Sequence, residues 1–231
     1  MVERDEQILK HIGKYGLSIR AVIEQLFFGG ATCDNVLNRL VKERRIASHH
    51  SIPGGLCYYR LTLSEARARL VPEHRARPKR GSALRLALQV LWFCCMSDKT
   101  RNRLERKKVG ETFGNGPGSG KPHCVESGEE RSLVYRIYAP GPHSRDGYLL
   151  RSIQHDMEKG LENPELRNWI EAKAFAFVVL VETPERKDRL KRLINKTGPY
   201  AARVLVEVVP GLTTLGEAIR KNKEKNNADG E

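Results

Sequence analysis

The hydrophobic positions in the first 45 residues repeat with the spacing of α-helices. Apolar side chains share one stripe in residues 5–15, and Gly16 is well placed to end that helix. A second helix is predicted from Ser18, a suitable N-cap, to Phe27, after which Phe28-Gly29-Gly30 turns the chain. A third helix is predicted over residues 32–45, so a tight turn joins the second and third helices.

The pattern then changes to the alternation that is typical of β-strands. Residues 46–52 and 56–61 each predict a strand, and Pro53-Gly54-Gly55 between them predicts a turn. Three helices followed by a hairpin is the order of elements in a winged helix-turn-helix domain.

The third predicted helix separates apolar from polar side chains. Its apolar stripe consists of Val36, Leu37, Leu40 and Val41. The opposite face carries Asn35, Asn38, Arg39 and Lys42. Asparagine can hydrogen-bond the edge of adenine, arginine can bind guanine, and lysine supplies charge to phosphates. This face, with Thr32 as the predicted N-cap, therefore favours contact with DNA, and the alternative is a basic surface helix in solvent.

The run YYRLTLSEARARL, which ends the hairpin, is similar to the wing strand and following helix of winged-helix regulators. The resemblance covers residues 4–71 and implies that residues 32–45 form the recognition helix and residues 49–59 the wing. Histidines of the wing could then touch phosphates, although two adjacent histidines on a strand point to opposite faces and only one would face DNA. Some winged helices instead use this fold for protein contacts alone. The predicted DNA-binding residues are Thr32, Asn35, Asn38, Arg39, Lys42, Arg45, His49, His50 and Arg60.

The charge of the chain is uneven along the sequence. The formal net charge is +13, from 41 Lys and Arg against 28 Asp and Glu. Residues 1–121 hold 23 basic and 11 acidic residues, whereas residues 122–231 hold 18 and 17. A positive field on the half that contains the predicted helix-turn-helix favours a polyanionic partner.

The middle of the chain predicts a linker and two further helices. Residues 72–81 are basic and contain two prolines and a glycine, which argue against helix and for a linker or a contact with phosphates. Ser82 is predicted to cap a helix over 83–96 that is apolar on nearly every side and too short to span a membrane. Such a helix must be buried all round, within the chain or against a second copy. Residues 98–110 predict a basic helix that lies in solvent or contacts phosphates.

The run GNGPGSGK at 114–121 resembles a phosphate-binding loop only in composition. Asn115 stands where that motif needs its first glycine, and Pro122 where it needs serine or threonine. No apolar strand leads into the run, so a flexible loop without nucleotide binding is predicted.

The last hundred residues predict an α/β domain. Strands are expected at 133–138, 175–182 and 204–209, and helices at 149–160, 164–173 and 184–195. The two continuous apolar strands and the charged helix between them form a βαβ unit, whose strands should be parallel. The polar residues from Arg220 onward predict a frayed tail. The predicted division is thus 1–71, 72–121, 122–219 and 220–231.

The layout also resembles the replication-relaxation family, in which a winged helix precedes a domain similar to restriction-type nucleases. The matching runs are FVVLVETPERKDRLKRLI and VLVEVV, within residues 133–215. This resemblance implies a DNA-binding protein of plasmids or other mobile elements, acting in replication, mobilisation or their control.

Nucleases of that class hold Mg²⁺ with carboxylates and use a Glu-x-Lys motif on a strand. Glu171-Ala172-Lys173 has this form, and Asp146 and Asp156 lie upstream. Because Pro164 predicts a helix through Lys173, the glutamate and lysine would diverge by about 200° around the helix axis. The sequence therefore favours a domain without catalysis, with a metal-dependent nuclease as the alternative.

The five cysteines lack the spacing of a disulfide framework or a zinc site, and no secretory signal is recognised at the amino end. We therefore expect a cytoplasmic, nucleoid-associated protein that needs no cofactor, metal or membrane. The leading hypothesis is a sequence-specific binder of double-stranded DNA that regulates transcription or replication, as a homodimer. A scaffold that meets protein partners through its winged helix is a third possibility.

Overall fold

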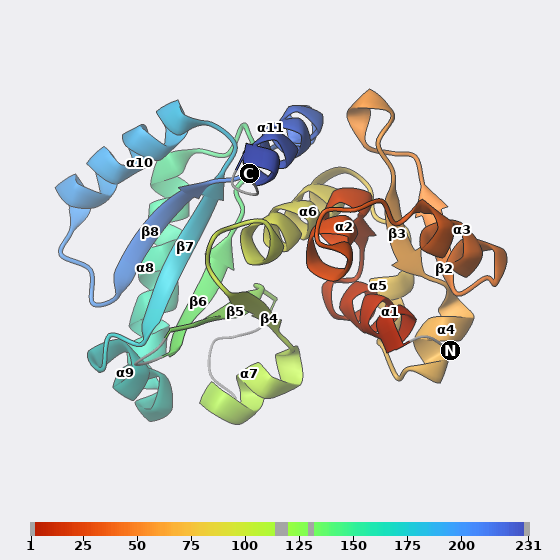
Figure 1. The fold of residues 1–231 in the computed structure, drawn as a ribbon. Helices are drawn as coiled ribbons and strands as arrows, with labels where there is room; N and C mark the ends of the chain where they lie inside the picture. The colour runs from red at the N-terminus through yellow and green to blue at the C-terminus, as the bar shows by residue number, and fades with distance from the viewer. Residues whose placement is uncertain (1–2, 114–119, 129–131, 229–231) are drawn as a thin grey trace. The chain divides into compact units, whose positions relative to one another are not determined.

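The computed structural model describes residues 3–113, 120–128 and 132–228, and the chain divides into two compact units (Figure 1). Unit 1 consists of Met1–Met96 together with Pro210–Glu231, and unit 2 consists of Ser97–Val209. The described residues form an α+β structure with one sheet in each unit. The predicted flexible loop falls mostly on residues 114–119, which lie outside the described residues.

Unit 1 combines helices with a small antiparallel sheet. Its elements are α1 (Glu3–Tyr15), β1 (Ser18–Ile19), α2 (Arg20–Phe28), α3 (Asp34–Lys42), β2 (Ile46–His49), the 3-10 turn η1 (Pro53–Gly55), β3 (Tyr58–Leu61), α4 (Leu63–Ala68), α5 (Glu73–Ala76), α6 (Gly81–Cys95) and α11 (Leu215–Ala228). The strands lie in the order β1-β3-β2, and both pairs are antiparallel. The predicted order of three helices and a hairpin is therefore present, with one additional short strand before α2.

The core of unit 1 forms from the stripes that the sequence predicted. Ile8, Leu9 and Ile12 of α1 are fully buried and belong to one cluster with Leu37 and Leu40 of α3. Two turns hold these helices in place. The N–H of Gly16 donates to the carbonyl of Ile12 at 2.7 Å, and Gly29 ends α2 in the left-handed region, which suits a residue without a Cβ.

Unit 2 is built on a mixed five-stranded sheet. Its strands β4 (Arg101–Leu104), β5 (His123–Ser127), β6 (Ser132–Tyr138), β7 (Phe175–Val181) and β8 (Arg203–Val208) lie in the order β4-β5-β6-β7-β8. The first two pairings are antiparallel and the last two are parallel. The parallel pairing of β7 with β8 across a helix confirms the predicted βαβ unit. All seven residues of β7 are buried, as its continuous apolar run requires.

Within the described residues of unit 2, four helices contribute to the core on one face of this sheet. They are α7 (Arg106–Phe113), α8 (Asp146–Glu162), α9 (Pro164–Glu171) and α10 (Pro184–Thr197), and each packs side chains into the cluster around Phe175 and Phe177. Two helix starts follow the sequence directly. Asn163 accepts a hydrogen bond from the N–H of Leu166 at 3.0 Å, and Thr183 caps α10 in the same way.

Several predicted elements differ from the structure. The segment 98–110 forms a strand followed by a helix, because Arg101 is buried against Glu126 on the neighbouring strand and does not lie in solvent. Strand β5 was not predicted. The linker 72–81 contains the short helix α5, since its two prolines flank the helix and do not interrupt it.

The apolar helix α6 also differs in detail. Ser82 is not its cap, because Arg80 occupies the N-cap position without a side-chain hydrogen bond. Ala83 is exposed and Leu86 and Trp92 are only partly buried, so the helix is not buried all round. Similarly, Ser18 lies in β1, and the N-cap of α2 is Ile19.

The predicted tail from Arg220 is helical through Ala228, as the continuation of α11. Leu215, Ile219 and Lys223 recur every four residues and so lie on one stripe. Leu215 is buried, and Lys223 forms an ion pair with Glu24 at 2.9 Å. The segment therefore belongs to unit 1, not to a separate tail.

Candidate nucleic-acid interface

Helix α3 presents a polar outer face. Leu37 and Leu40 are buried beneath it, while Asn35, Asn38 and Lys42 are exposed. Within the described residues, no side-chain hydrogen bond or ion pair is recorded for these three side chains. Their amide and ammonium groups are thus available to a ligand on the outside of unit 1.

Arg39 shares this face but already has partners inside the protein. Its guanidinium donates to both carboxylate oxygens of Asp5, at 2.9 and 2.8 Å, and lies 3.6 Å from Glu43. Asp5 is buried, with 2% of its side chain exposed, whereas 42% of the Arg39 side chain is exposed. Arg39 therefore anchors α3 to α1, which is a different role from the base contact that the sequence predicted.

The predicted N-cap of α3 is wrong by one residue. Cys33 holds the N-cap position and makes no side-chain cap, while Thr32 lies before it. The hydroxyl of Thr32 donates to Asp34 at 3.0 Å and accepts from Arg20 at 3.3 Å, and Arg20 also pairs directly with Asp34. The start of α3 is thus held by ionic contacts with α2.

Arg45 lies in an ionic network and only 14% of its side chain is exposed. It donates to Glu6 at 3.1 Å and to Glu65 at 2.8 Å, and Arg69 bonds the same two carboxylates. Burial alone would raise the pKa of Glu65, but the hydrogen bonds from Arg45 and Arg69 lower it below its usual value. Arg45 therefore joins the end of α3 to α1 and α4 and is not presented to a ligand.

The predicted DNA-binding residues of the hairpin also include side chains with partners inside the protein and one that is exposed. His49 stacks on Tyr58 with ring centroids 5.2 Å apart, and its Nε2 accepts a hydrogen bond from Arg60 at 2.7 Å. Burial and the neighbouring Arg60 charge lower the pKa of His49, which keeps the ring neutral. Arg60 also donates to the carbonyl of Ala76 at 2.6 Å. Of the three wing residues that were predicted, only His50 is exposed.

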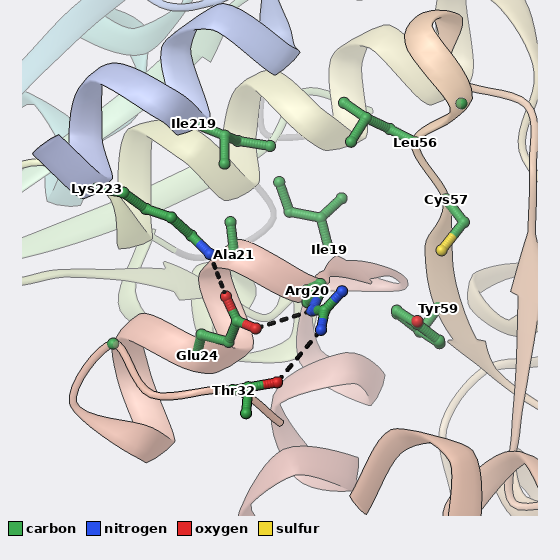
Figure 2. A pocket seen from close by; sticks show the side chains of 12 residues that line it. Ile19, Arg20, Ala21, Glu24, Thr32, Leu56, Cys57, Tyr59, Ile219 and Lys223 are labelled. Carbon is green, nitrogen blue, oxygen red and sulfur yellow. Dashed lines mark hydrogen bonds and ion pairs between the residues drawn. The ribbon is translucent and has the colours of Figure 1, made fainter. Parts of the chain in front are cut away.

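A pocket of about 480 Å³ lies elsewhere in unit 1, between the start of α2, the chain before α3, the segment leading into β3, and α11 (Figure 2). Glu24 is buried at its edge and accepts from Arg20 at 2.8 Å and from Lys223 at 2.9 Å. Burial would raise the pKa of Glu24, but these two hydrogen bonds lower it. No pattern in the sequence indicates this site, because Glu24 and Lys223 are 199 residues apart and neither belongs to a motif.

The positive charge is spread over both units. Unit 1 contains 20 basic and 12 acidic residues, and unit 2 contains 21 and 16. The contrast found along the sequence decreases to net charges of +8 and +5, because the basic stretch 97–121 belongs to unit 2 and the neutral segment 210–231 to unit 1. Net charge therefore does not distinguish unit 1 as strongly as the sequence indicated.

The residues of the alternative nuclease site do not converge in unit 2. Asp146 is paired with Arg186 at 2.9 Å and Arg189 at 2.7 Å. Asp156 accepts from Lys121 at 2.7 Å and is 2.9 Å from Arg136. Glu171 is the last residue of α9, whereas Lys173, which was predicted to belong to the same helix, lies beyond its end with a left-handed φ of 55°. Among the described residues, no group of three or more His, Cys, Asp or Glu side chains is placed to hold a metal ion.

No protein family model, curated protein or solved structure matches the chain. In the parts of the chain that the structure describes, no helix is both long enough and apolar enough to cross a membrane.

Proposed function

We propose that the chain binds double-stranded DNA and that unit 1 is a winged helix-turn-helix domain. The element order α1-β1-α2-α3-β2-β3 and the strand order β1-β3-β2 support this assignment. In such a domain α3 lies in the major groove and the β2–β3 hairpin contacts the backbone beside it.

The observation that carries the proposal is the outer face of α3. Asn35, Asn38 and Lys42 are exposed above a buried apolar stripe, and each is chemically suited to a base edge or a phosphate. We assign base contacts to Asn35 and Asn38, and phosphate contacts to Lys42 and His50. Arg39 acts by holding the helix in place.

The biological role that we propose is regulation of transcription or replication, of the kind that plasmids and mobile elements require, without catalysis. A homodimer would match a two-fold DNA site whose half-sites are one helical turn apart. The resemblance to the replication-relaxation family supports the role, since that family combines a winged helix with a degenerate nuclease-like domain.

The test begins with selection of a preferred duplex from a random pool, followed by binding measurements at two salt concentrations. We expect Asn38→Ala to weaken binding to the selected duplex by about 1–3 kcal/mol and to leave scrambled DNA unaffected. Lys42→Ala should weaken both duplexes and reduce the salt slope by about one.

Lys191→Ala is the matched control, because Lys191 is an exposed lysine on α10 in unit 2. Affinities of Asn38→Ala and Lys42→Ala that equal those of this control would refute α3 as the DNA-contacting helix. Failure of the selection to enrich any duplex would refute sequence-specific binding.

A further inference from the structure

The pocket of unit 1 has the size of a site for a small molecule. Its volume of about 480 Å³ lies within the range of typical ligand sites, roughly 300–1,000 Å³. Its lining residues, most of them labelled in Figure 2, come from β1, α2, the segment before α3, the segment that leads into β3, β3 itself and α11. All of these segments belong to unit 1.

The lining combines an apolar wall with two cations. Ile19, Leu56 and Ile219 supply aliphatic surface, and the ring of Tyr59 lies on the same side as Cys57 (Figure 2). Arg20 and Lys223 supply the charge, with 46% and 55% of their side chains exposed. A ligand that satisfies both parts has an apolar body and an anionic group.

The two carboxylates that pair with Arg20 and Lys223 differ in how far they are exposed to solvent. Glu24 is buried, with 3% of its side chain exposed, and both of its oxygens are occupied by Arg20 and Lys223. Asp34, the other acidic partner of Arg20, has 48% of its side chain exposed and is the first residue of α3. An ion pair between two half-exposed side chains is weak, so an incoming anion competes with Asp34 more easily than with Glu24.

We infer that this pocket binds a small organic acid, whose carboxylate takes the place of Asp34 on Arg20 and whose apolar body lies against Ile19, Leu56 and Ile219. The carboxylate accepts from the guanidinium of Arg20 and gains further attraction from Lys223. Binding adds one negative charge and separates the carboxylate of Asp34, at the start of α3, from the cation of Arg20.

The consequence for DNA rests on the proposed function. A freed Asp34 and a bound anion place negative charge beside the helix that faces the phosphates, so occupation of the pocket weakens duplex binding. Linkage requires that duplex weakens binding of the acid by the same factor. Unit 1 is thus a DNA-binding domain that responds to an organic acid.

The experiment uses the full chain and phenylacetate as the probe, detected by displacement of the fluorescent dye anilinonaphthalene sulfonate. We expect saturable displacement by phenylacetate below ~10 mM, and at least about tenfold weaker displacement by neutral phenylacetamide and by acetate, which has no apolar body. Equal displacement by phenylacetamide would overturn the assignment of an anion site.

Four variants test the location of the site. Arg20→Gln and Leu56→Asp should each weaken phenylacetate by about tenfold, since one removes the cation and the other places a carboxylate in the apolar wall. Asp34→Asn should instead tighten it several-fold, because it removes the competing partner of Arg20. The matched control is Lys221→Gln, which replaces an exposed lysine two residues from Lys223 and should leave the affinity for phenylacetate unchanged.

The gain of affinity in Asp34→Asn separates a ligand site from a fault in folding, because a damaged unit would lose affinity. Unchanged affinity in both Arg20→Gln and Asp34→Asn would overturn the proposal. A duplex titration with and without phenylacetate tests the coupling. Displacement of the dye without any effect on a bound duplex would refute the coupling alone, and absence of duplex binding would refute the proposed function while the pocket stands.

Discussion

Replacing Arg39 by alanine should destabilise unit 1, whatever it does to DNA. The substitution removes the two hydrogen bonds that Arg39 donates to Asp5 and leaves that carboxylate buried without its cation. Removing one partner of a fully buried ion pair costs about 3–5 kcal/mol. Because 42% of the Arg39 side chain is exposed, water screens the pair and enters the space that is left, which reduces the expected cost to about 1–3 kcal/mol.

The measurement is urea unfolding followed by tryptophan fluorescence. The chain has two tryptophans, Trp92 in α6 of unit 1 and Trp169 in α9 of unit 2, so a Trp169→Phe background reports on unit 1 alone. Lys42→Ala is the control on the same face, and it should change the free energy of unfolding by less than about 0.5 kcal/mol.

A double-mutant cycle of Asp5→Ala with Arg39→Ala isolates the pair. We expect the double variant to be more stable than the sum of the single losses predicts, by about 1 kcal/mol or more, because the buried charge is removed together with its partner. A loss in Arg39→Ala no larger than that of Lys42→Ala would refute the anchoring role. It would return Arg39 to the set of candidate base-reading residues.

Three further results are expected. Burial lowers the pKa of His11 in unit 1 and of His123 in unit 2 to about 4, so the unfolded chain binds more protons between pH 6.5 and 4 and both units lose stability as the pH falls through that window. Urea unfolding at pH 7 and pH 5 should show this loss of stability. His11→Gln should reduce the loss in unit 1 only, and equal stability at the two pH values would contradict the prediction. Supercoiled plasmid should remain intact with Mg²⁺ or Mn²⁺, and chelator should leave duplex binding unchanged; metal-dependent nicking that disappears in Glu171→Ala would replace the proposed function with a nuclease. Sedimentation should show a dimer, and a wild-type monomer at micromolar concentration would refute the proposed homodimer; because Leu88 and Leu91 are already buried within one chain, Leu88→Asp with Leu91→Asp should unfold or aggregate the protein in either case.

The sequence was most informative where local chemistry alone decides the structure. The stripe of α1, the continuous apolar run of β7 and the cap at Asn163 each depend on neighbours within a few residues, and all three are present. Strand β4 could not be recognised in this way. It is an edge strand with the sequence RNRL, and its buried Arg101 is neutralised by Glu126 and Glu207, which no local pattern reveals.

The candidate interface shows the same limit. Periodicity correctly placed Asn38, Arg39 and Lys42 on the outer face of one helix. It could not distinguish an arginine that meets a ligand from one that meets a buried carboxylate 34 residues away, as Arg39 does. The resemblance to winged-helix regulators assigned Arg45 and Arg60 to DNA, although both are held by partners in other elements. The sequence shows that a residue is basic, but the tertiary structure decides whether its side chain contacts a ligand or another part of the protein.

Because α11 packs with the amino-terminal segment, the two parts of unit 1 are synthesised at different times. On a ribosome, residues 3–96 emerge before unit 2, and the whole of unit 2 must be made before residues 210–228 exist. Until then Glu24 is without Lys223, and the pocket lacks the wall that Ile219 provides. Unit 1 therefore begins to fold without α11 and is completed only after unit 2 has been synthesised. A chain that ends anywhere within unit 2 contains α3 but lacks the α11 wall of the pocket.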